Sequence, residues 1–277
     1  MNTIQQHPGF PSQYVLPRQI DVWLPPTDQM ATNQRYPVLY MHDGQNLFDR
    51  TIAYGGEHWG VAEALLDLIS KELAPPVIIV GIWNTERRWT EYLPQRPFPN
   101  GFDDYLPAHL KQLLQQKLDG HLPQSDSYLR FLTRELKPFI DQTYPTRPEQ
   151  NHTFIMGSSM GGLISMYALC EYPDLFAGAG CLSTHWPAGE HLLLDYLAHY
   201  LPAPDSHTFY FDYGTETLDA AYEPWQKQAD TILNHAGYTQ NKDYLTRRFA
   251  GAAHNEFFWR QRVHIPLAFL LGGKLVD

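Results

Sequence analysis

The chain has 277 residues and a formal net charge of −10, with 43% hydrophobic and 14% aromatic residues. This composition is typical of a folded globular protein rather than a disordered one, and the length suffices for one large core. The negative charge argues against a nucleic-acid partner, because such affinity depends heavily on Lys and Arg.

The elements predicted along the chain alternate between strands and helices. Residues 19–24 alternate in polarity as an edge strand does, whereas 36–41 and 77–80 are continuous apolar runs typical of strands covered on both faces. Helical periodicity over 59–73 makes this part a β-α-β unit. Further strands are predicted near 153–156, 178–182, 207–212 and 244–249, and further helices over 127–144, 163–170, 190–199, 222–236 and 257–271. This alternation predicts an α/β fold with a mostly parallel sheet and helices on both faces. No linker divides the chain, so we expect one domain over residues 1–277.

Residues 84–125 interrupt this alternation. The segment is rich in proline and aromatic residues and contains a helix-like stretch at 109–118. A loop of this length inside a domain is usually functional or disordered, and the aromatic residues argue against disorder. We therefore predict an inserted lid or substrate wall, with Trp89 and Phe98 among the side chains that meet the substrate.

A G-x-S-x-G pattern from Gly157 to Gly161 places Ser159 between a short β run and an amphipathic helix. The five letters alone are a weak signal, but this context is that of a strand, a sharp turn and a helix, which exposes a nucleophilic serine at the tip. The two glycines meet the steric demand of the turn. We predict that Ser159 is a nucleophile; an idle serine in a glycine-rich turn is the alternative.

A serine needs a base, usually a histidine that a carboxylate orients, and in this fold class the chain order is serine, acid, histidine. His254 lies in the loop after the last predicted strand and is the predicted base. Asp212, Glu216 and Asp219 compete for the role of the acid. We favour Asp219, because a short side chain just before the next helix is usual there, and Glu216 remains a close second. Asp219 as a plain helix cap is the alternative.

An oxyanion needs two backbone donors, one after the nucleophile and one in the loop after an earlier strand. Met160 follows Ser159 and supplies the first amide. The loop after the strand at 36–41 supplies the second, with Gln45 as the predicted donor and Gly44 allowing close approach. A plain glycine turn is the alternative for this loop.

Several segments together resemble the putative-esterase family of α/β-hydrolases, relatives of siderophore esterases, feruloyl and acetyl-xylan esterases and esterase D. The matching pieces are H-D-G-Q-N-L-F from His42, V-G-I-W-N-T from Val80, E-Y-L-P from Glu91, Y-L-R-F-L-T-R-E-L-K-P-F-I-D from Tyr128, G-S-S-M-G-G from Gly157 and G-A-A-H-N-E-F-F-W from Gly251. The resemblance runs from about residue 20 to the end of the chain. It implies an α/β-hydrolase fold, a Ser159–His254 pair and an oxyanion hole at Gln45 and Met160.

The resemblance also implies a carboxylic ester hydrolase that acts through an acyl-enzyme on a small-molecule ester. The acid segment departs from the family's usual G-x-x-D or G-x-x-E, because Thr217 stands three residues after Gly214. Trp186 stands where related enzymes carry aromatic residues near the substrate, so it is a candidate contact.

Other functions remain open from the sequence. An acyltransferase or thioesterase would use the same site, and a catalytically silent binding module would share the fold. A metallohydrolase is disfavoured because the chain has no H-E-x-x-H motif. We expect no metal and no cofactor. No apolar window has the length of a bilayer span, and Cys170 and Cys181 suit a reducing compartment, so we expect no membrane partner and a cytoplasmic location.

Overall fold

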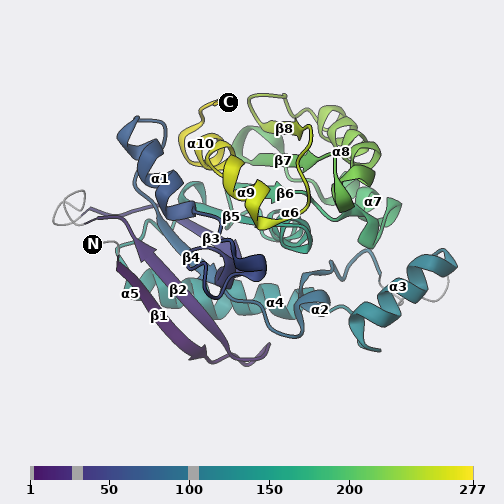
Figure 1. Cartoon of the computed structure of the whole chain (residues 1–277), viewed down its shortest axis with the longest axis horizontal. Helices are drawn as coiled ribbons and strands as arrows, with labels where there is room; N and C mark the ends of the chain where they lie inside the picture. Colours follow the sequence, from purple (N-terminus) through teal and green to yellow (C-terminus); the bar gives the residue numbers. More distant parts are fainter. Residues whose placement is uncertain (1–2, 27–33, 99–105, 277) are drawn as a thin grey trace.

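The computed structural model describes residues 3–26, 34–98 and 106–276, and its centre is one eight-stranded sheet (Figure 1). The strand order is β1-β2-β4-β3-β5-β6-β7-β8. The strands are β1 Thr3–Phe10, β2 Arg18–Leu24, β3 Val38–His42, β4 Ile78–Ile82, β5 Thr153–Ser158, β6 Gly178–Leu182, β7 Thr208–Gly214 and β8 Tyr244–Phe249. Strands β4, β3 and β5 to β8 pair in parallel, and β2 is antiparallel to both β1 and β4. The predicted α/β class is confirmed.

Strand β1 corrects the prediction that residues 19–24 form an edge strand. It lies outside β2 and forms the edge itself. Its sequence gives little sign of a strand, because it has no apolar run and contains Pro8 and Gly9, and most of the residues are exposed. The register shifts between His7 and Phe10, where Gly9 has a positive φ. Such irregularity is common at sheet edges.

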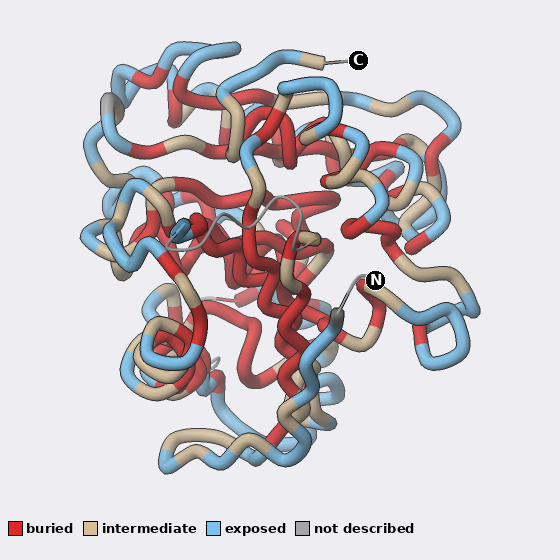
Figure 2. Tube along the Cα trace, turned by 90° about the vertical axis from the view of Figure 1, so that its left-hand side faces the viewer, coloured by how far each residue is buried: buried red, intermediate tan, exposed pale blue. Residues whose placement is uncertain are grey.

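Helices cover both faces of the sheet, as the alternation predicts. They are α1 Val61–Ser70, α2 Arg88–Tyr92, α3 Ala108–Leu118, α4 Ser125–Phe131, a π-helical turn Leu132–Leu136, α5 Lys137–Thr143, α6 Met160–Glu171, α7 His191–Tyr200, α8 Glu223–His235, α9 Glu256–Arg262 and α10 His264–Gly272. Helices α1, α9 and α10 pack on one face, and α2 to α8 contribute to the core on the other. Figure 2 shows the buried residues running through the centre of the molecule between these two layers.

The central strands are buried on both faces. In β3, Val38 and Tyr40 point into the core under α4 to α8, whereas Leu39 and Met41 point into the core under α1 and α10. This is the period of two expected of a strand, and it explains why the segment reads as a continuous apolar run.

The predicted helix at 257–271 is two helices, α9 and α10, which meet at Val263. Pro266 explains the break. Its ring has no N–H and crowds the carbonyl of Arg262 four residues earlier, so one continuous helix is disfavoured.

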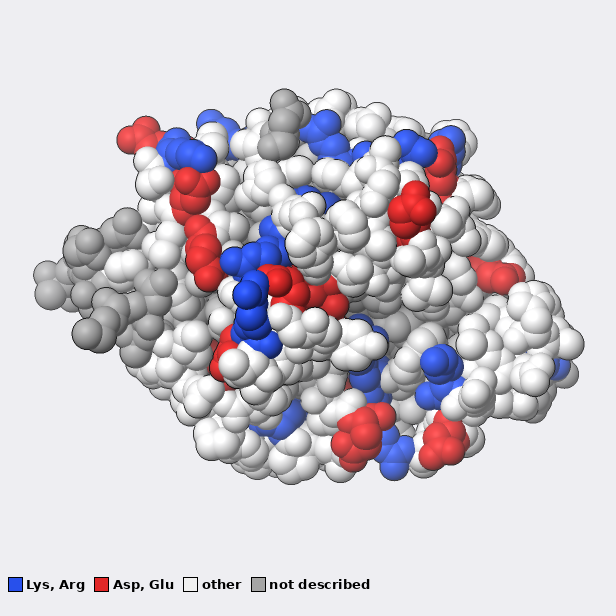
Figure 3. Space-filling model, viewed as in Figure 1, with Lys and Arg blue, Asp and Glu red and all other residues white. Residues whose placement is uncertain are grey.

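The segment at 84–125 carries α2 and α3, and α3 matches the helix predicted at 109–118. Several of its apolar side chains, Leu110, Leu114 and Leu118 among them, are buried against the rest of the molecule, whereas Leu122 is exposed. Over the face seen in Figure 3, the basic and acidic side chains of the described residues are interspersed.

Candidate active site

The turn between β5 and α6 carries the predicted nucleophile. Ser159 follows the last residue of β5 and precedes the first residue of α6, with φ 59° and ψ −122°. A non-glycine residue in this region is strained, and such strain is characteristic of functional turns. A Cβ at Gly157 would stand 2.7 Å from the carbonyl carbon of Gly161, so the turn closes only without that side chain. The predicted steric role of the glycine is confirmed.

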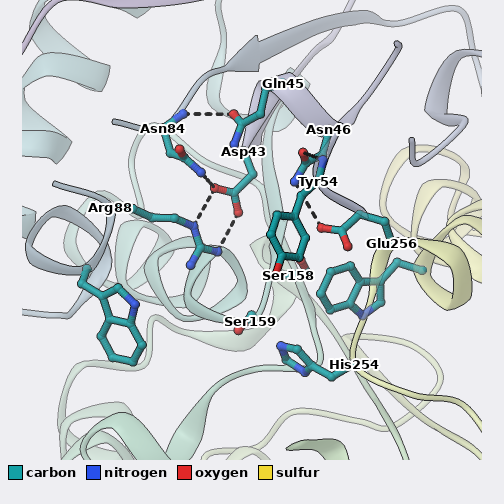
Figure 4. A pocket seen from close by; sticks show the side chains of 12 residues that line it. Asp43, Gln45, Asn46, Tyr54, Asn84, Arg88, Ser158, Ser159, His254 and Glu256 are labelled. Carbon is teal, nitrogen blue, oxygen red and sulfur yellow. Dashed lines mark hydrogen bonds and ion pairs between the residues drawn. The ribbon is translucent and has the colours of Figure 1, made fainter. Parts of the chain in front are cut away.

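The loop after β8 brings His254 to the same place. Its Nδ1 lies 2.5 Å from Oδ1 of Asp219, and its backbone N–H donates to Oγ1 of Thr217 at 2.9 Å. Figure 4 shows the imidazole beside Ser159 at one end of a pocket. The three chain segments that the sequence singled out therefore converge at the carboxyl ends of β5, β7 and β8.

The two candidate acids have opposite surroundings. Asp219 is 1% exposed, and its Oδ2 accepts from Oγ of Ser183 and from the backbone N–H of Gly214, each at 2.6 Å. Burial alone would raise the pKa of Asp219, but the bond to His254 and these two donors hold it below its ordinary range. Glu216 is exposed and accepts from Oγ1 of Thr215 at 3.3 Å. The structure brings Asp219 to His254 and leaves Glu216 at the surface.

The two residues predicted to donate to an oxyanion each lie in the first turn of a short or long helix. Met160 begins α6, and Gln45 lies in the short helix Gly44–Asn46 after β3. Amides in the first turn of a helix have no intrahelical acceptor. A Cβ at Gly44 would stand 2.6 Å from the carbonyl carbon of Gly81, which is the close approach predicted for this glycine.

Ser159, His254 and Gln45 line a pocket of about 490 Å³. Its lining residues come from the end of β5 and from the segments that follow β3, β4, β5 and β8, and they are Asp43, Gln45, Asn46, Tyr54, Asn84, Arg88, Trp89, Ser158, Ser159, His254, Glu256 and Trp259. Trp89, predicted to meet the substrate, is among them. Phe98 is buried instead and lies against the loop at Gly189.

Trp186 is not where the sequence led us to expect it, and the prediction of a substrate contact is corrected. The indole is fully buried, its Nε1–H donates to Oε1 of Gln226 at 3.0 Å, and its ring packs near Phe211. Its neighbour His185 is closer to the site, because the His185 N–H donates to the carbonyl of Ser159 at 3.2 Å. Burial lowers the pKa of His185 to about 3, which keeps this ring neutral.

An ion pair in the pocket wall could not be predicted from the sequence. Nε and Nη2 of Arg88 each donate to Asp43 at 2.7 Å, and Nδ2 of Asn84 donates to the same carboxylate at 2.6 Å (Figure 4). Although burial opposes charging of both groups, the pairing lowers the pKa of Asp43 and raises that of Arg88. The partners are far apart in the chain, so no local pattern could have joined them.

Glu256 is a second group that was not predicted from the sequence. It is 8% exposed, lines the pocket, and accepts from Nδ2 of Asn46 at 3.2 Å. Burial raises its pKa to about 7. The signal that could have found it is its place shortly after His254 in the chain, at the start of α9.

With this geometry in place, comparison with known proteins decides the family. The model of the Putative esterase family matches residues 15–262. The chain belongs to this family. The esterase is a carboxylic ester hydrolase, as the resemblance implied.

Individual relatives are more distant. The esterase is 24% identical to the uncharacterized protein YbbA of Bacillus subtilis over 92% of this chain and 93% of YbbA. It is 28% identical to the ferri-bacillibactin esterase BesA of the same organism, over 54% of this chain and 49% of BesA. An IroE-like serine hydrolase from Shewanella oneidensis has the same fold, with a TM-score of 0.71 and 20% identity over 99% of this chain and 82% of that one. The α/β-hydrolase fold is thereby confirmed. Among the described residues of the esterase, no helix is both long and apolar enough to cross a bilayer.

Proposed function

We propose that the esterase hydrolyses small-molecule esters with Ser159 as nucleophile, His254 as general base and Asp219 as the acid that orients it. The observation that carries this proposal is the 2.5 Å contact between Asp219 and Nδ1 of His254. It leaves Nε2 as the nitrogen available to Ser159, which lies at the tip of a strained turn in the same pocket. This combination of groups is what activation of a serine requires.

In this mechanism Nε2 of His254 takes the proton of Ser159 as Oγ attacks the carbonyl carbon of the ester. The backbone amides of Gln45 and Met160 donate to the oxyanion. When the tetrahedral intermediate collapses, the C–O bond to the alcohol breaks and the imidazolium gives its proton to the departing alkoxide. Water then attacks the acyl-enzyme by the same steps and releases the acid and free Ser159.

The pocket favours a substrate that is aromatic or otherwise flat and carries little net charge. Tyr54, Trp89 and Trp259 supply rings to its lining, and the charge of Arg88 is already balanced by Asp43. Trp89 comes from the segment at 84–125, so we assign that segment the role of a substrate wall. An aryl or hydroxycinnamoyl ester of a sugar fits these features.

A fluorophosphonate probe tests the chemistry directly. It should label Ser159 in stoichiometric amount, and Ser159→Ala should abolish labelling and lower kcat by roughly 10⁴ to 10⁶. Ser158, which also lines the pocket, is the internal control. Labelling of Ser158, or full activity of Ser159→Ala, would refute the assignment.

A substrate panel then narrows the ester. It consists of p-nitrophenyl esters of graded length, an acetylated sugar, a feruloyl ester and S-formylglutathione, and the products are identified in each case. Free acid as the product supports hydrolysis. Transfer of the acyl group to an added alcohol would instead indicate an acyltransferase, and preference for the thioester a thioesterase.

A further inference from the structure

A buried serine lies on the far side of the proposed acid. Ser183 follows β6, is fully buried, and has φ 43°, a backbone conformation that L-residues rarely adopt. Its Oγ lies 2.6 Å from Oδ2 of Asp219, 2.9 Å from Nη2 of Arg262 and 3.0 Å from Nε1 of Trp259. Three buried side chains therefore converge on one hydroxyl.

The chemistry of these partners fixes the direction of the hydroxyl. A guanidinium and an indole N–H can only donate, so Arg262 and Trp259 occupy the two acceptor positions of the Ser183 oxygen. Its single hydrogen is left for the carboxylate of Asp219, which can only accept when ionised. The hydroxyl thus donates to Asp219 and has no competing acceptor among these partners.

Arg262 is itself held in place by a second buried carboxylate. Its Nη2 and Nε donate to the two oxygens of Asp212 at 2.9 and 3.1 Å, and Oδ1 of Asp212 also accepts from the backbone N–H of Ser183 at 3.1 Å. Nη2 lies 4.0 Å from Oδ2 of Asp219. The guanidinium therefore orients the hydroxyl and also lies close to the charge of the proposed acid.

Trp259 also contacts the proposed base. Its ring meets the imidazole of His254 edge to face, with centroids 5.0 Å apart and an interplanar angle of 78°. The side chains of His254, Asp219, Ser183 and Trp259 thus form a closed ring of contacts.

We propose that Ser183 is a positioning residue of the active site. Its hydroxyl holds one oxygen of Asp219 so that the other stays on Nδ1 of His254. Without it, the Gly214 amide is the one remaining hydrogen-bond donor to Oδ2 among the residues that the structure describes. The inference rests on the proposed function, because Ser183 has nothing to position if Asp219 is not the acid.

The first test compares two buried hydroxyls in the same turn. Ser183→Ala should lower kcat roughly 10- to 100-fold, as loss of an outer orienting partner does, with KM changed less than about twofold. Thr184→Val is the matched control, since Thr184 is also buried but donates to the carbonyl of Cys181. It should keep kcat within about twofold of wild type. Ser183→Cys, which replaces the hydroxyl by a weaker donor on a somewhat larger atom, should have a kcat between those of wild type and Ser183→Ala. A wild-type kcat for Ser183→Ala or Ser183→Cys in folded protein would overturn the inference.

The second test separates positioning from general structural support by a double-mutant cycle. In an Asp219→Asn background, Ser183→Ala should lower kcat by less than about threefold, because the group that it positions is already lost. The same loss of kcat in both backgrounds would show that Ser183 supports the structure only. Wild-type activity of Asp219→Asn would refute the proposed triad instead, so the two failures are distinguishable.

Discussion

At the scale of single residues, Asp219 and Glu216 are three positions apart in the chain but differ in burial and in hydrogen bonding. Asp219 is buried with both oxygens held, whereas Glu216 is exposed to water. A fixed carboxylate can hold one histidine tautomer, but a solvated one that rotates freely cannot.

We therefore predict that Asp219→Asn lowers kcat by up to about 10⁴, because the amide stabilises the wrong tautomer of His254. Glu216→Gln is the control and should leave kcat nearly unchanged. Steady-state kinetics on one p-nitrophenyl ester measure both. The reverse ranking would reassign the acid to Glu216.

How much of the site the sequence could predict depends on how local each signal is. Ser159 and His254 were predictable because each is marked by its own turn or loop. The choice of Asp219 could only be favoured, since it depends on the short helix Thr217–Ala221 that buries the side chain. The Arg88–Asp43 pair was not predictable at all, because Asp43 follows β3 and Arg88 begins α2, and the two segments meet only after folding.

A second residue-scale prediction concerns Glu256. Burial raises its pKa from the ordinary value of 4.5 to about 7, so the folded protein holds this proton more tightly than the unfolded chain. The stability that this group contributes is complete below pH 4.5 and is lost as the pH rises to about 7. Glu256→Gln should remove this loss.

Urea denaturation of wild type and variant from about pH 4.5 to 8 tests this pH dependence. Between pH 4.5 and about 7, the free energy of unfolding of the variant should rise relative to that of wild type by up to about 3 kcal/mol. Above this range the difference between the two proteins should stay constant. A constant difference at every pH would mean that Glu256 ionises normally in the folded protein.

At the scale of elements, one side of α2 faces the pocket and the other side packs in the core. Trp89 lines the pocket, with Nζ of Lys117 5.4 Å above its ring, whereas Tyr92 is fully buried in the core. Elements with this double role mix polar, aromatic and apolar residues, which is why 84–125 reads as irregular. Strand β1 escaped prediction for the complementary reason, because an exposed edge strand needs no apolar face.

We predict that Trp89→Ala raises KM for bulky aryl esters and leaves a small acetate ester nearly unchanged, since the ring can contact only what extends beyond the scissile bond. Leu122→Ala is a matched control, because Leu122 belongs to the same segment but is 61% exposed and lies outside the pocket. Equal losses on both esters in Trp89→Ala would mean that the segment supports the structure without selecting the substrate.

At the scale of the whole molecule, a buried ion pair joins the antiparallel end of the sheet to the segment at 84–125, the proposed substrate wall. Arg18 in β2 donates from both terminal nitrogens to Glu91 in α2, at 2.7 and 2.9 Å, and the two side chains are 1% and 2% exposed. The guanidinium also lies over the rings of Tyr128 and Phe131 in α4. Three elements that are distant in the chain thus depend on one charge pair.

Removing one partner of such a pair leaves a buried charge without compensation, and this costs far more than the pair contributes. We therefore predict that Glu91→Gln lowers the free energy of unfolding by about 3 to 5 kcal/mol. The double variant Arg18→Met with Glu91→Leu should recover much of the loss, because no charge is then buried. Urea unfolding followed by tryptophan fluorescence measures all three proteins. If the double variant is as unstable as Glu91→Gln, the specific geometry of the pair is needed to position the segment at 84–125. KM for bulky esters should then rise in both variants.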